Sequence, residues 1–209
     1  MLYYGHSGMS KGIDYLVEAI PEILQGNPDG VLIFNLIPAK RDREIREKII
    51  RYSEAVVAYP PDKGCRDALI KRPNPMEGGL STKKSPLPHF PAVLTGHSMK
   101  GGVYIFDEQP QVVLRELVAT ADIVIAPSLA EGFGSVHSET CAMGKVLLTT
   151  QVAAIPEVVS GQVKFISPSS REAIVQGIKE IREGNIESIP SKTFNREESV
   201  EKIEQLYQP

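Results

Sequence analysis

The sequence predicts an α/β fold in which helices cover both faces of a parallel β-sheet. Short apolar runs with strand character alternate along the chain with segments whose apolar residues recur at a helical period. The apolar runs lie at residues 2–5, 30–35, 55–58, 102–107, 122–126, 146–150 and 163–166. Strands that alternate with helices favour a parallel sheet, because each connection has to cross back over the sheet. We therefore expect one Rossmann-like domain over residues 1–209.

The composition of the 209-residue chain fits such a domain, since 42% of the residues are apolar and can form a substantial core. The formal net charge of −3 gives no indication of a nucleic-acid partner. The two cysteines, Cys65 and Cys141, form no disulfide framework, which is typical of a reducing compartment. We expect no signal peptide, and the sequence contains no apolar run of about 18 residues. We expect no transmembrane segment, and a location that is cytoplasmic, or peripheral to a membrane in a longer protein.

Helices are expected between these runs. The segment 11–20 has apolar residues at the spacing of one helix face, and Ser10 is a suitable N-cap for it. The segment 40–52 is rich in Arg and Glu at i,i+4 spacing, which indicates a solvated helix face. Ser135 is expected to cap a short helix. Further helices are expected over residues 111–120, 169–183 and 195–207.

Residues 60–101 interrupt this pattern. The segment holds seven prolines and is locally basic, so we interpret it as an insertion that is functional or partly disordered. A strand is expected within it at residues 92–95. His89 and His97 have no Cys or Asp at ligand spacing, and we therefore expect no metal site.

The turn that follows the apolar run 122–126 carries the clearest functional signal. Gly132 and Gly134 allow a backbone to approach a ligand closely. Open α/β sheets bind ligands at the carboxyl ends of their strands, where this turn is expected. Glu131 lies in the turn, and Glu139, eight positions later, lies about one helical turn into the short helix, so both carboxylates can face one site. Carboxylates accept hydrogen bonds from hydroxyl groups, and helix N-termini favour anions, so the pattern indicates a polyhydroxylated or phosphorylated ligand.

These residues resemble a known family. Glu131-Gly-Phe-Gly134 with Glu139 resembles the Glu-x7-Glu motif of retaining glycosyltransferases with the GT-B fold, family 4 in particular. Ala142-Met-Gly-Lys-Val-Leu-Leu-Thr-Thr150 and Ala153-Ala-Ile-Pro-Glu-Val-Val159 resemble the two segments that follow this motif in the family. The resemblance covers residues 2–58 and 102–207 and is specific within 121–160. It implies the donor-binding half of a GT-B fold.

A second element of the family is present near the start of the chain. Gly5-His6 and Lys11-Gly12 resemble its Gly-Arg-x4-Lys-Gly element, in which the Arg and Lys bind the diphosphate of a nucleotide-sugar donor. The resemblance implies phosphate binding by Lys11, Gly12 and His6. His6 stands in place of the Arg, and a neutral His is a weaker phosphate partner than a bidentate Arg.

The implied activity is transfer of a sugar, with retention of configuration, from a nucleoside diphosphate sugar to an unknown acceptor. Glu131 is the implied catalytic residue, without being assigned as a nucleophile. It would bind the donor sugar together with Gly132, Phe133 and Gly134, and Glu139 would bind the ribose. No metal or other cofactor is implied, because cationic side chains and helix N-termini would offset the charge of the leaving diphosphate.

Three other functions fit the same architecture. One is a nucleotide-sugar epimerase, although the Glu-Gly-Phe-Gly turn argues against it. The others are a non-catalytic nucleotide-sugar-binding module and an interaction protein with a relic fold that binds no nucleotide. In the resembling family an N-terminal acceptor domain precedes this point. We therefore expect the acceptor domain to be absent from this chain and to be its partner in a two-domain enzyme. We also expect the donor-binding domain to be inactive when it is isolated.

Overall fold

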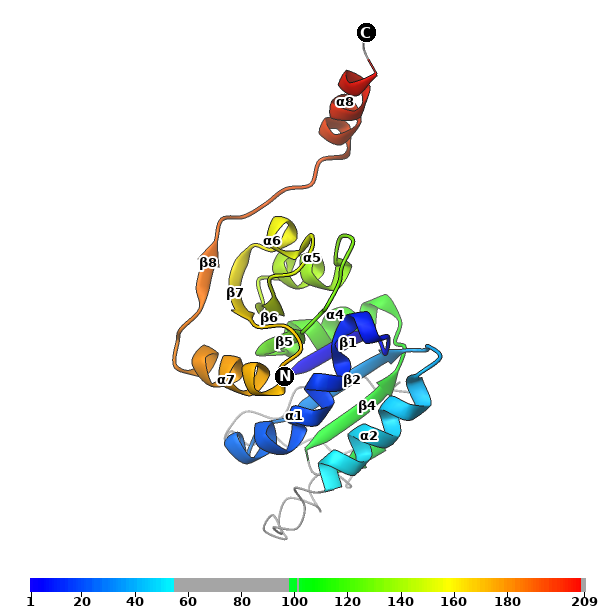
Figure 1. Ribbon diagram of the computed structural model, residues 1–209, viewed down its shortest axis with the longest axis vertical. Helices are drawn as coiled ribbons and strands as arrows, with labels where there is room; N and C mark the ends of the chain where they lie inside the picture. Colours follow the sequence, from blue (N-terminus) through cyan, green and yellow to red (C-terminus); the bar gives the residue numbers. More distant parts are fainter. Residues whose placement is uncertain (55–97, 101, 208–209) are drawn as a thin grey trace, which may run out of the picture.

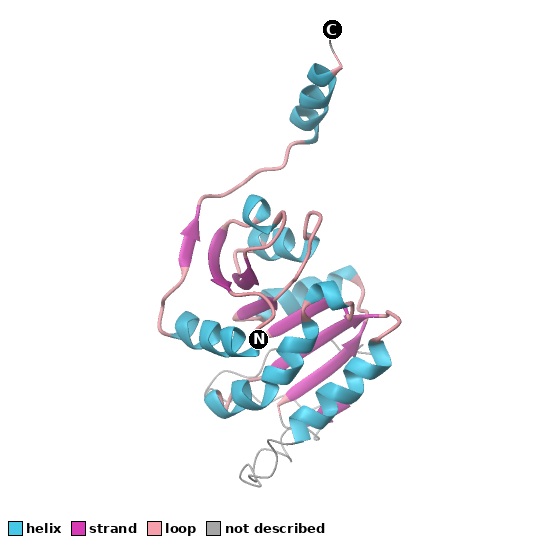
Figure 2. Ribbon diagram, viewed as in Figure 1, coloured by secondary structure: helices cyan, strands magenta, loops and turns pink. Residues whose placement is uncertain are grey.

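The computed structural model describes residues 1–54, 98–100 and 102–207, and this part of the chain forms an α/β fold (Figures 1 and 2). Its sheet has eight strands in the order β3-β4-β2-β1-β5-β6-β7-β8. The strands are β1 (Leu2–His6), β2 (Leu32–Ile37), β3 (Ser98–Lys100), β4 (Val103–Asp107), β5 (Ile123–Ala126), β6 (Val146–Thr150), β7 (Gly161–Ile166) and β8 (Glu187–Ile189). The helices are α1 (Ile13–Gly26), α2 (Asp42–Glu54), α4 (Gln111–Thr120), α5 (Ser135–Ala142), α6 (Ile155–Val158), α7 (Arg171–Arg182) and α8 (Arg196–Leu206), with a 3-10 turn at Met9–Lys11.

The sheet confirms the predicted Rossmann-like architecture. The six central strands are parallel, and only the edge strands β3 and β8 pair antiparallel, with β4 and β7. From β1 the chain builds outward through β2 to β4, and it then returns to the other side of β1 to form β5, β6 and β7. Leu2 of β1 accordingly pairs with Ile33 of β2 and with Val124 of β5. The order of the strands therefore reverses between β1 and β5, which is where such sheets bind ligands.

Both faces of the sheet are buried, because alternate residues of one strand point to opposite sides. In β5, Ile123 and Ile125 join the core beneath α1, α2 and α7, while Val124 and Ala126 join the core beneath α4 and α6. Figure 1 shows helices on both sides of the strands, as the sequence predicts. The last helix, α8, has no buried residue and stands clear of the sheet (Figure 1).

The boundaries of the first helix differ from the prediction. A helix ending at residue 20 is expected, yet α1 continues through Pro21 to Gly26. Ile23 and Leu24 lie in the core, and their burial outweighs the hydrogen bond that Pro21 does not make. Ser10 does not cap α1. The N-cap is Gly12, in the left-handed conformation.

Several other elements were not predicted or lie outside the described residues. The short strand β8 and the four-residue helix α6 have no expected counterpart in the sequence. The predicted strands at 55–58 and 92–95, and almost all of the 60–101 insertion, fall outside the described residues. None of the described helices combines the length and apolar character needed to span a membrane.

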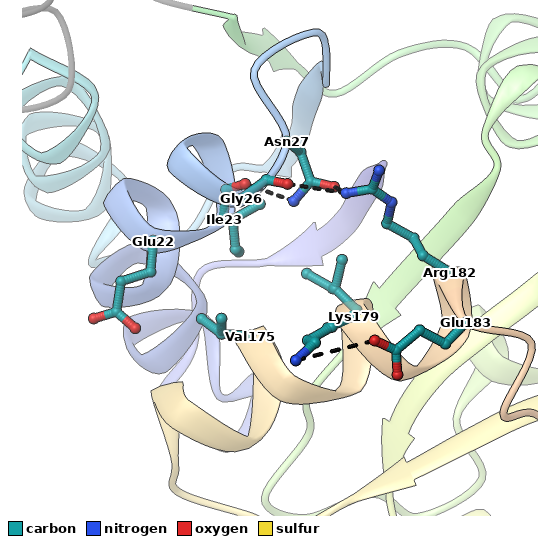
Figure 3. A pocket seen from close by; sticks show the side chains of 9 residues that line it. Glu22, Ile23, Gly26, Asn27, Val175, Lys179, Arg182 and Glu183 are labelled. Atoms are coloured by element: carbon teal, nitrogen blue, oxygen red, sulfur yellow. Dashed lines mark hydrogen bonds and ion pairs between the residues drawn. The ribbon is translucent and has the colours of Figure 1, made fainter.

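A cavity of about 540 Å³ separates the C-terminal ends of α1 and α7 (Figure 3). It lies at the edge of the sheet opposite to the strand carboxyl ends, because the helices of parallel units run antiparallel to their strands. The Arg182 guanidinium closes one side by donating to Gly26 O at 2.9 Å and to Asn27 Oδ1 at 2.6 Å. An arginine on the last carbonyls of a helix satisfies groups that the helix leaves unpaired, so this contact joins α1 to α7.

Candidate functional site

The turns that follow β1 and β5 are joined directly to each other. Ser10 O accepts hydrogen bonds from Leu129 N at 2.7 Å and from Ala130 N at 3.2 Å. Gly12 has a φ of +64°, and a Cβ at this position would lie 1.9 Å from Pro127 O. Only glycine fits so close to a carbonyl in this conformation. The site is therefore built on a tight junction between two loops, at the point where the strand order reverses.

The junction places Lys11 beside Glu131. Lys11 Nζ lies 2.6 Å from Glu131 Oε1, and Ser128 Oγ donates to the same oxygen at 2.9 Å. The Glu131 side chain is 8% exposed and the Lys11 side chain is 28% exposed. An ammonium group has three donors, so the exposed part of Lys11 keeps hydrogen-bonding capacity toward a ligand. The structure thus brings together two residues that the sequence separately predicts to bind phosphate and sugar.

The sequence predicts that a helix begins at Lys11, but the structure places Lys11 before the helix. It ends the 3-10 turn Met9–Lys11, and Gly12 separates it from α1. The reason is the left-handed conformation that Gly12 adopts to pass Pro127 O. Lys11 thus directly precedes the N-cap of α1, and it offers a ligand its own charge beside its pair with Glu131.

The helix α5 begins at Ser135, as predicted, but its N-cap is Gly134 and no side chain caps it. Gly134 has a φ of +83°, and a Cβ there would lie 2.7 Å from Nδ1 of His137. Glycine is thus required at 134 both for its conformation and for space. Gly132 has no such constraint, since its φ is not in the left-handed range and a Cβ would have open space around it. That open space lies next to Glu131, where a ligand would approach.

His137 is a buried polar residue beneath this turn. Its Nε2 is 2.9 Å from Thr149 Oγ1, and the Thr149 hydroxyl donates to Ala126 O at 2.8 Å. Because that hydroxyl hydrogen is used, Nε2 is the donor and His137 carries its proton there. Burial lowers the pKa of His137, against a smaller raising effect of Glu131. A neutral imidazole therefore links α5 to the ends of β5 and β6.

Glu139 lies on the exposed side of α5 and contacts β1. The Tyr4 hydroxyl lies 3.1 Å from Val136 O and 3.3 Å from both Glu139 Oε2 and Thr140 Oγ1, and its one hydrogen is shared among these acceptors. Burial raises the pKa of Tyr4, and the neighbouring Glu139 adds to the effect. The tyrosine therefore remains a neutral donor that orients the Glu139 carboxylate while leaving it open to solvent.

His6 is the last residue of β1, and its side chain is exposed. Its carbonyl accepts a hydrogen bond from Tyr3 OH at 2.8 Å. A Cβ on the preceding residue, Gly5, would lie 4.0 Å from Val136 Cγ2 in the first turn of α5. His6 consequently lies at the same edge of the sheet as the α5 turn.

Sequence reasoning missed three residues of this site: Ser128, Tyr4 and His137. Ser128 lies two residues past the carboxyl end of β5, so a search of strand ends for polar groups would have found it. Tyr4 lies in the middle of β1, which such a search does not reach. His137 has no signal of this kind, because its partner Thr149 is on another strand. Within residues 1–54, 98–100 and 102–207, no three His, Cys, Asp or Glu side chains are grouped as a metal site would require.

Comparison with known proteins gives a family. Residues 95–204 match the model of the family Glycosyl transferases group 1. The phosphatidylinositol N-acetylglucosaminyltransferase GPI3 subunit of Saccharomyces cerevisiae is 24% identical over 119 residues, which cover 56% of this chain and 25% of that protein. The chain thus spans about a quarter of the length of this curated relative.

Solved structures give the same fold. A UDP-forming α,α-trehalose-phosphate synthase from Burkholderia xenovorans matches with a TM-score of 0.58 and 13% identity, over 86% of this chain and 35% of its own. A glycosyltransferase from Rickettsia africae matches with a TM-score of 0.56 and 17% identity, over 87% of this chain and 37% of its own. At identities this low, the matches bear on the fold alone. The fold that they confirm is one half of a GT-B architecture. Because the family model covers more than half of the residues, this protein belongs to the glycosyl transferases of group 1.

Proposed function

We propose that this chain is the donor-binding domain of a retaining glycosyltransferase that uses a nucleoside diphosphate sugar. The observation that carries the proposal is the cluster of Lys11, Ser128 and Glu131 between the first and fifth strands. A cation and a carboxylate held side by side match a donor that has phosphates next to sugar hydroxyls. The cluster lies where the strand order reverses, which is the ligand-binding position of open α/β sheets.

The phosphate side of the proposed site consists of Lys11, the backbone at Gly12 and the exposed His6. When the sugar is transferred, negative charge develops on the departing diphosphate, and a fixed cation stabilises it. Lys11 is held in place for this role by its contact with Glu131. His6 is the weaker phosphate contact, since it lacks the bidentate geometry of an Arg. No metal is assigned, and the reaction is expected to proceed in the presence of EDTA.

The sugar side consists of Glu131 and the turn that follows it. Both protein contacts of the carboxylate use Oε1, so a sugar hydroxyl would bind at Oε2. The N–H groups of Phe133 and Gly134, together with the open space at Gly132, would receive the sugar ring. Glu131 is thus the proposed catalytic residue in contact with the transferred sugar.

Glu139 would bind the ribose of the donor. Its carboxylate is exposed, and it is oriented by Tyr4 OH at 3.3 Å. A carboxylate that keeps free acceptor sites binds two neighbouring hydroxyl groups well. This assigns the two glutamates to different parts of the donor.

The complete reaction requires more protein than this chain. The chain corresponds to 25% of the GPI3 subunit and to 35% and 37% of the two similar solved chains described above. UDP is a suitable first nucleotide to test, since the similar structures include a UDP-forming synthase and one bound with UDP-2-fluoro glucose. Retention of configuration is supported by a similar trehalose-6-phosphate synthase that was used to study glycosyltransfer with retention. The isolated chain should bind donor without transferring sugar.

Calorimetry with UDP, GDP and ADP, and with their glucose and N-acetylglucosamine esters, tests the proposal. At least one nucleotide should bind, and Lys11→Met should weaken it about 10-fold or more, because a charged hydrogen bond is lost. Lys179→Met is the matched control, since Lys179 is 67% exposed on α7, near the opposite edge of the sheet. Melting curves check that each variant is folded. Absence of binding at millimolar concentration, or equal loss in both lysine variants, would overturn the proposal.

A further inference from the structure

A segment near the C-terminus contacts the turn that follows Glu131 before it reaches α8. We call residues 190–195, between β8 and α8, the C-terminal strap. β8 is the edge strand and pairs with β7, with Ile189 opposite Gly161. In Figure 1 the chain then runs from β8 past α6 toward α8. Two side chains of the strap contact the body of the domain, and they contact different elements.

Lys192 fastens the strap to α6. Its Nζ donates to Pro156 O at 2.7 Å and to Glu157 O at 2.9 Å. The carbonyl groups in the last turn of a helix have no partner within the helix, and a cation there is favoured by the helix dipole. α6 has only four residues, so its carbonyl groups depend on such outside donors. The strap is therefore anchored by a specific polar contact.

Phe194 contacts the turn that carries Glu131. The rings of Phe194 and Phe133 meet edge to face, with centroids 5.2 Å apart and planes at 76°. This geometry is a favourable one for aromatic pairs. Phe133 is 48% exposed and Phe194 is 57% exposed, so neither ring is part of the core. The pair thus holds the middle of the turn from outside.

This contact restrains a turn whose other residues are glycines. Phe133 is flanked by Gly132 and Gly134, the residue type with the greatest backbone freedom. Between Glu131 and Ser135 it is the only residue with a side chain that can be held. The N–H groups that would bind the donor sugar belong to this same segment. A ring contact at Phe133 therefore limits how far they can move before the sugar arrives.

We propose that Phe194 is a positioning residue for the donor sugar, acting through its ring contact with Phe133. This inference rests on the proposed function, because it assumes that the turn receives the sugar. It requires that loss of the Phe194 ring weakens the binding of a nucleotide sugar. It also requires that binding of the bare nucleotide is unaffected, since the phosphate and ribose contacts come from other residues.

The test compares Phe194→Ala, Phe194→Tyr and the control Leu206→Ala in calorimetry with UDP, UDP-glucose and UDP-N-acetylglucosamine. Leu206 is 82% exposed on α8 and offers an equally apolar side chain away from the turn. Phe194→Ala should weaken nucleotide-sugar binding about 3- to 10-fold, the effect of one aromatic pair, and leave UDP binding unchanged. Phe194→Tyr should restore the parent affinity. Lys192→Met should shift sugar binding in the same direction by a smaller factor.

Hydrogen exchange provides a readout that needs no ligand. Backbone amides of residues 132–134 should exchange faster in Phe194→Ala than in the parent or in Leu206→Ala. Unchanged exchange in that variant overturns the inference, as does equal weakening of UDP and UDP-sugar binding. Failure of the parent protein to bind any nucleotide is a different result, which overturns the proposed function. In that case faster exchange still supports the contact, and unchanged exchange rejects it.

Discussion

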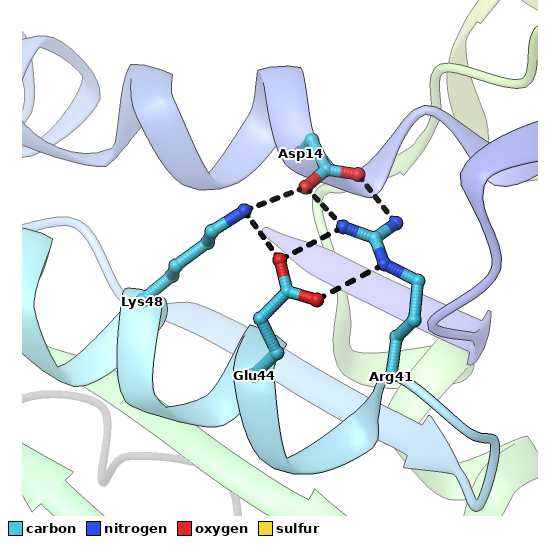
Figure 4. A network of polar contacts seen from close by, with 4 residues as sticks. All are labelled: Asp14, Arg41, Glu44 and Lys48. Carbon is cyan, nitrogen blue, oxygen red and sulfur yellow. Dashed lines mark hydrogen bonds and ion pairs between the residues drawn. The ribbon is translucent and has the colours of Figure 1, made fainter.

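Two groups of ion pairs differ in how much hydrogen-bonding capacity they leave unused. Their first residues are three positions apart in the chain. Lys11 belongs to the first group and Asp14, in the first turn of α1, to the second. The guanidinium of Arg41 donates to both Asp14 oxygens, at 2.9 and 2.8 Å. Lys48 contacts Asp14 at 3.2 Å and Glu44 at 2.8 Å, and Glu44 also pairs with Arg41 (Figure 4). Two cations and two carboxylates thus satisfy one another on the outer surface of α1 and α2.

The Lys11–Glu131 pair is arranged differently. Its carboxylate is 8% exposed, whereas those of Asp14 and Glu44 are 24% and 50% exposed. It joins two loops at the carboxyl edge of the sheet, while the Asp14 group joins two helices. The ammonium of Lys11 keeps donors free at an edge where a ligand can approach. The number of charged side chains in a cluster therefore does not identify a ligand-binding site. Position on the sheet and unused hydrogen-bonding capacity are the better guides.

Gly12→Ala should have the largest effect, because it breaks the junction that holds Lys11 beside Glu131. The new Cβ would lie 1.9 Å from Pro127 O at a φ of +64°, so the two loops must separate. We expect a loss of at least about 3 kcal/mol of unfolding free energy, as for severe overpacking with backbone strain. Urea denaturation measures it.

Gly144→Ala is the control for Gly12→Ala. Gly144 has nearly the same φ, +65°, but a Cβ there would have open space. The conformational cost alone is about 1–2 kcal/mol. Equal losses in the two variants would show that the close contact at Pro127 does not matter, and would remove the loop junction from this account.

Asp14→Asn should have a smaller effect and should leave nucleotide binding unchanged. The hydrogen bonds from Arg41 lower the pKa of Asp14, with burial opposing the shift and Lys48 adding to it. A carboxylate whose pKa is lowered by folding contributes stability above its unfolded pKa of about 3.9 and loses it as the pH falls further. We expect Asn to cost about 1 kcal/mol near neutral pH, within the range for ion-pair networks at a surface.

The difference in stability between the parent and Asp14→Asn should shrink as the pH drops below about 4. It should also shrink in high salt, which screens exposed charges. Thermal melts across pH 3–7 at two salt concentrations measure both effects. A change in UDP affinity in this variant would contradict the separation of the two groups.

Much of the fold was predictable from the sequence, because the central strands are continuous apolar runs such as Ile123–Ala126. The edge strand β8 was missed since Glu187–Ile189 is short and largely exposed, without an apolar run. The helix caps were wrong for a tertiary reason. Gly12 and Gly134 replace the expected serine caps because neighbouring groups of the fold occupy the space of a Cβ.

The contacts of the candidate site could not be predicted from the sequence. Glu131 and Lys11 were identified through family motifs, but the 2.6 Å pair joins positions 120 residues apart in the sequence. It depends on β5 pairing beside β1, which no local pattern specifies. The Phe133–Phe194 contact depends in the same way on the path of the strap. Local periodicity specifies elements, and the site arises where distant elements meet.

The proposed function assigns the donor sugar to Glu131 and the ribose to Glu139. Calorimetry of Glu131→Gln and Glu139→Gln with UDP, and with the UDP-sugar that the parent binds best, distinguishes these two roles. Each lost charged hydrogen bond should cost about 1.5–3 kcal/mol. Glu131→Gln should lose UDP-sugar affinity and keep or improve UDP affinity, because Lys11 is released from its pair. Glu139→Gln should weaken both ligands alike. Equal weakening of UDP and UDP-sugar in Glu131→Gln, in a folded protein, would contradict the account.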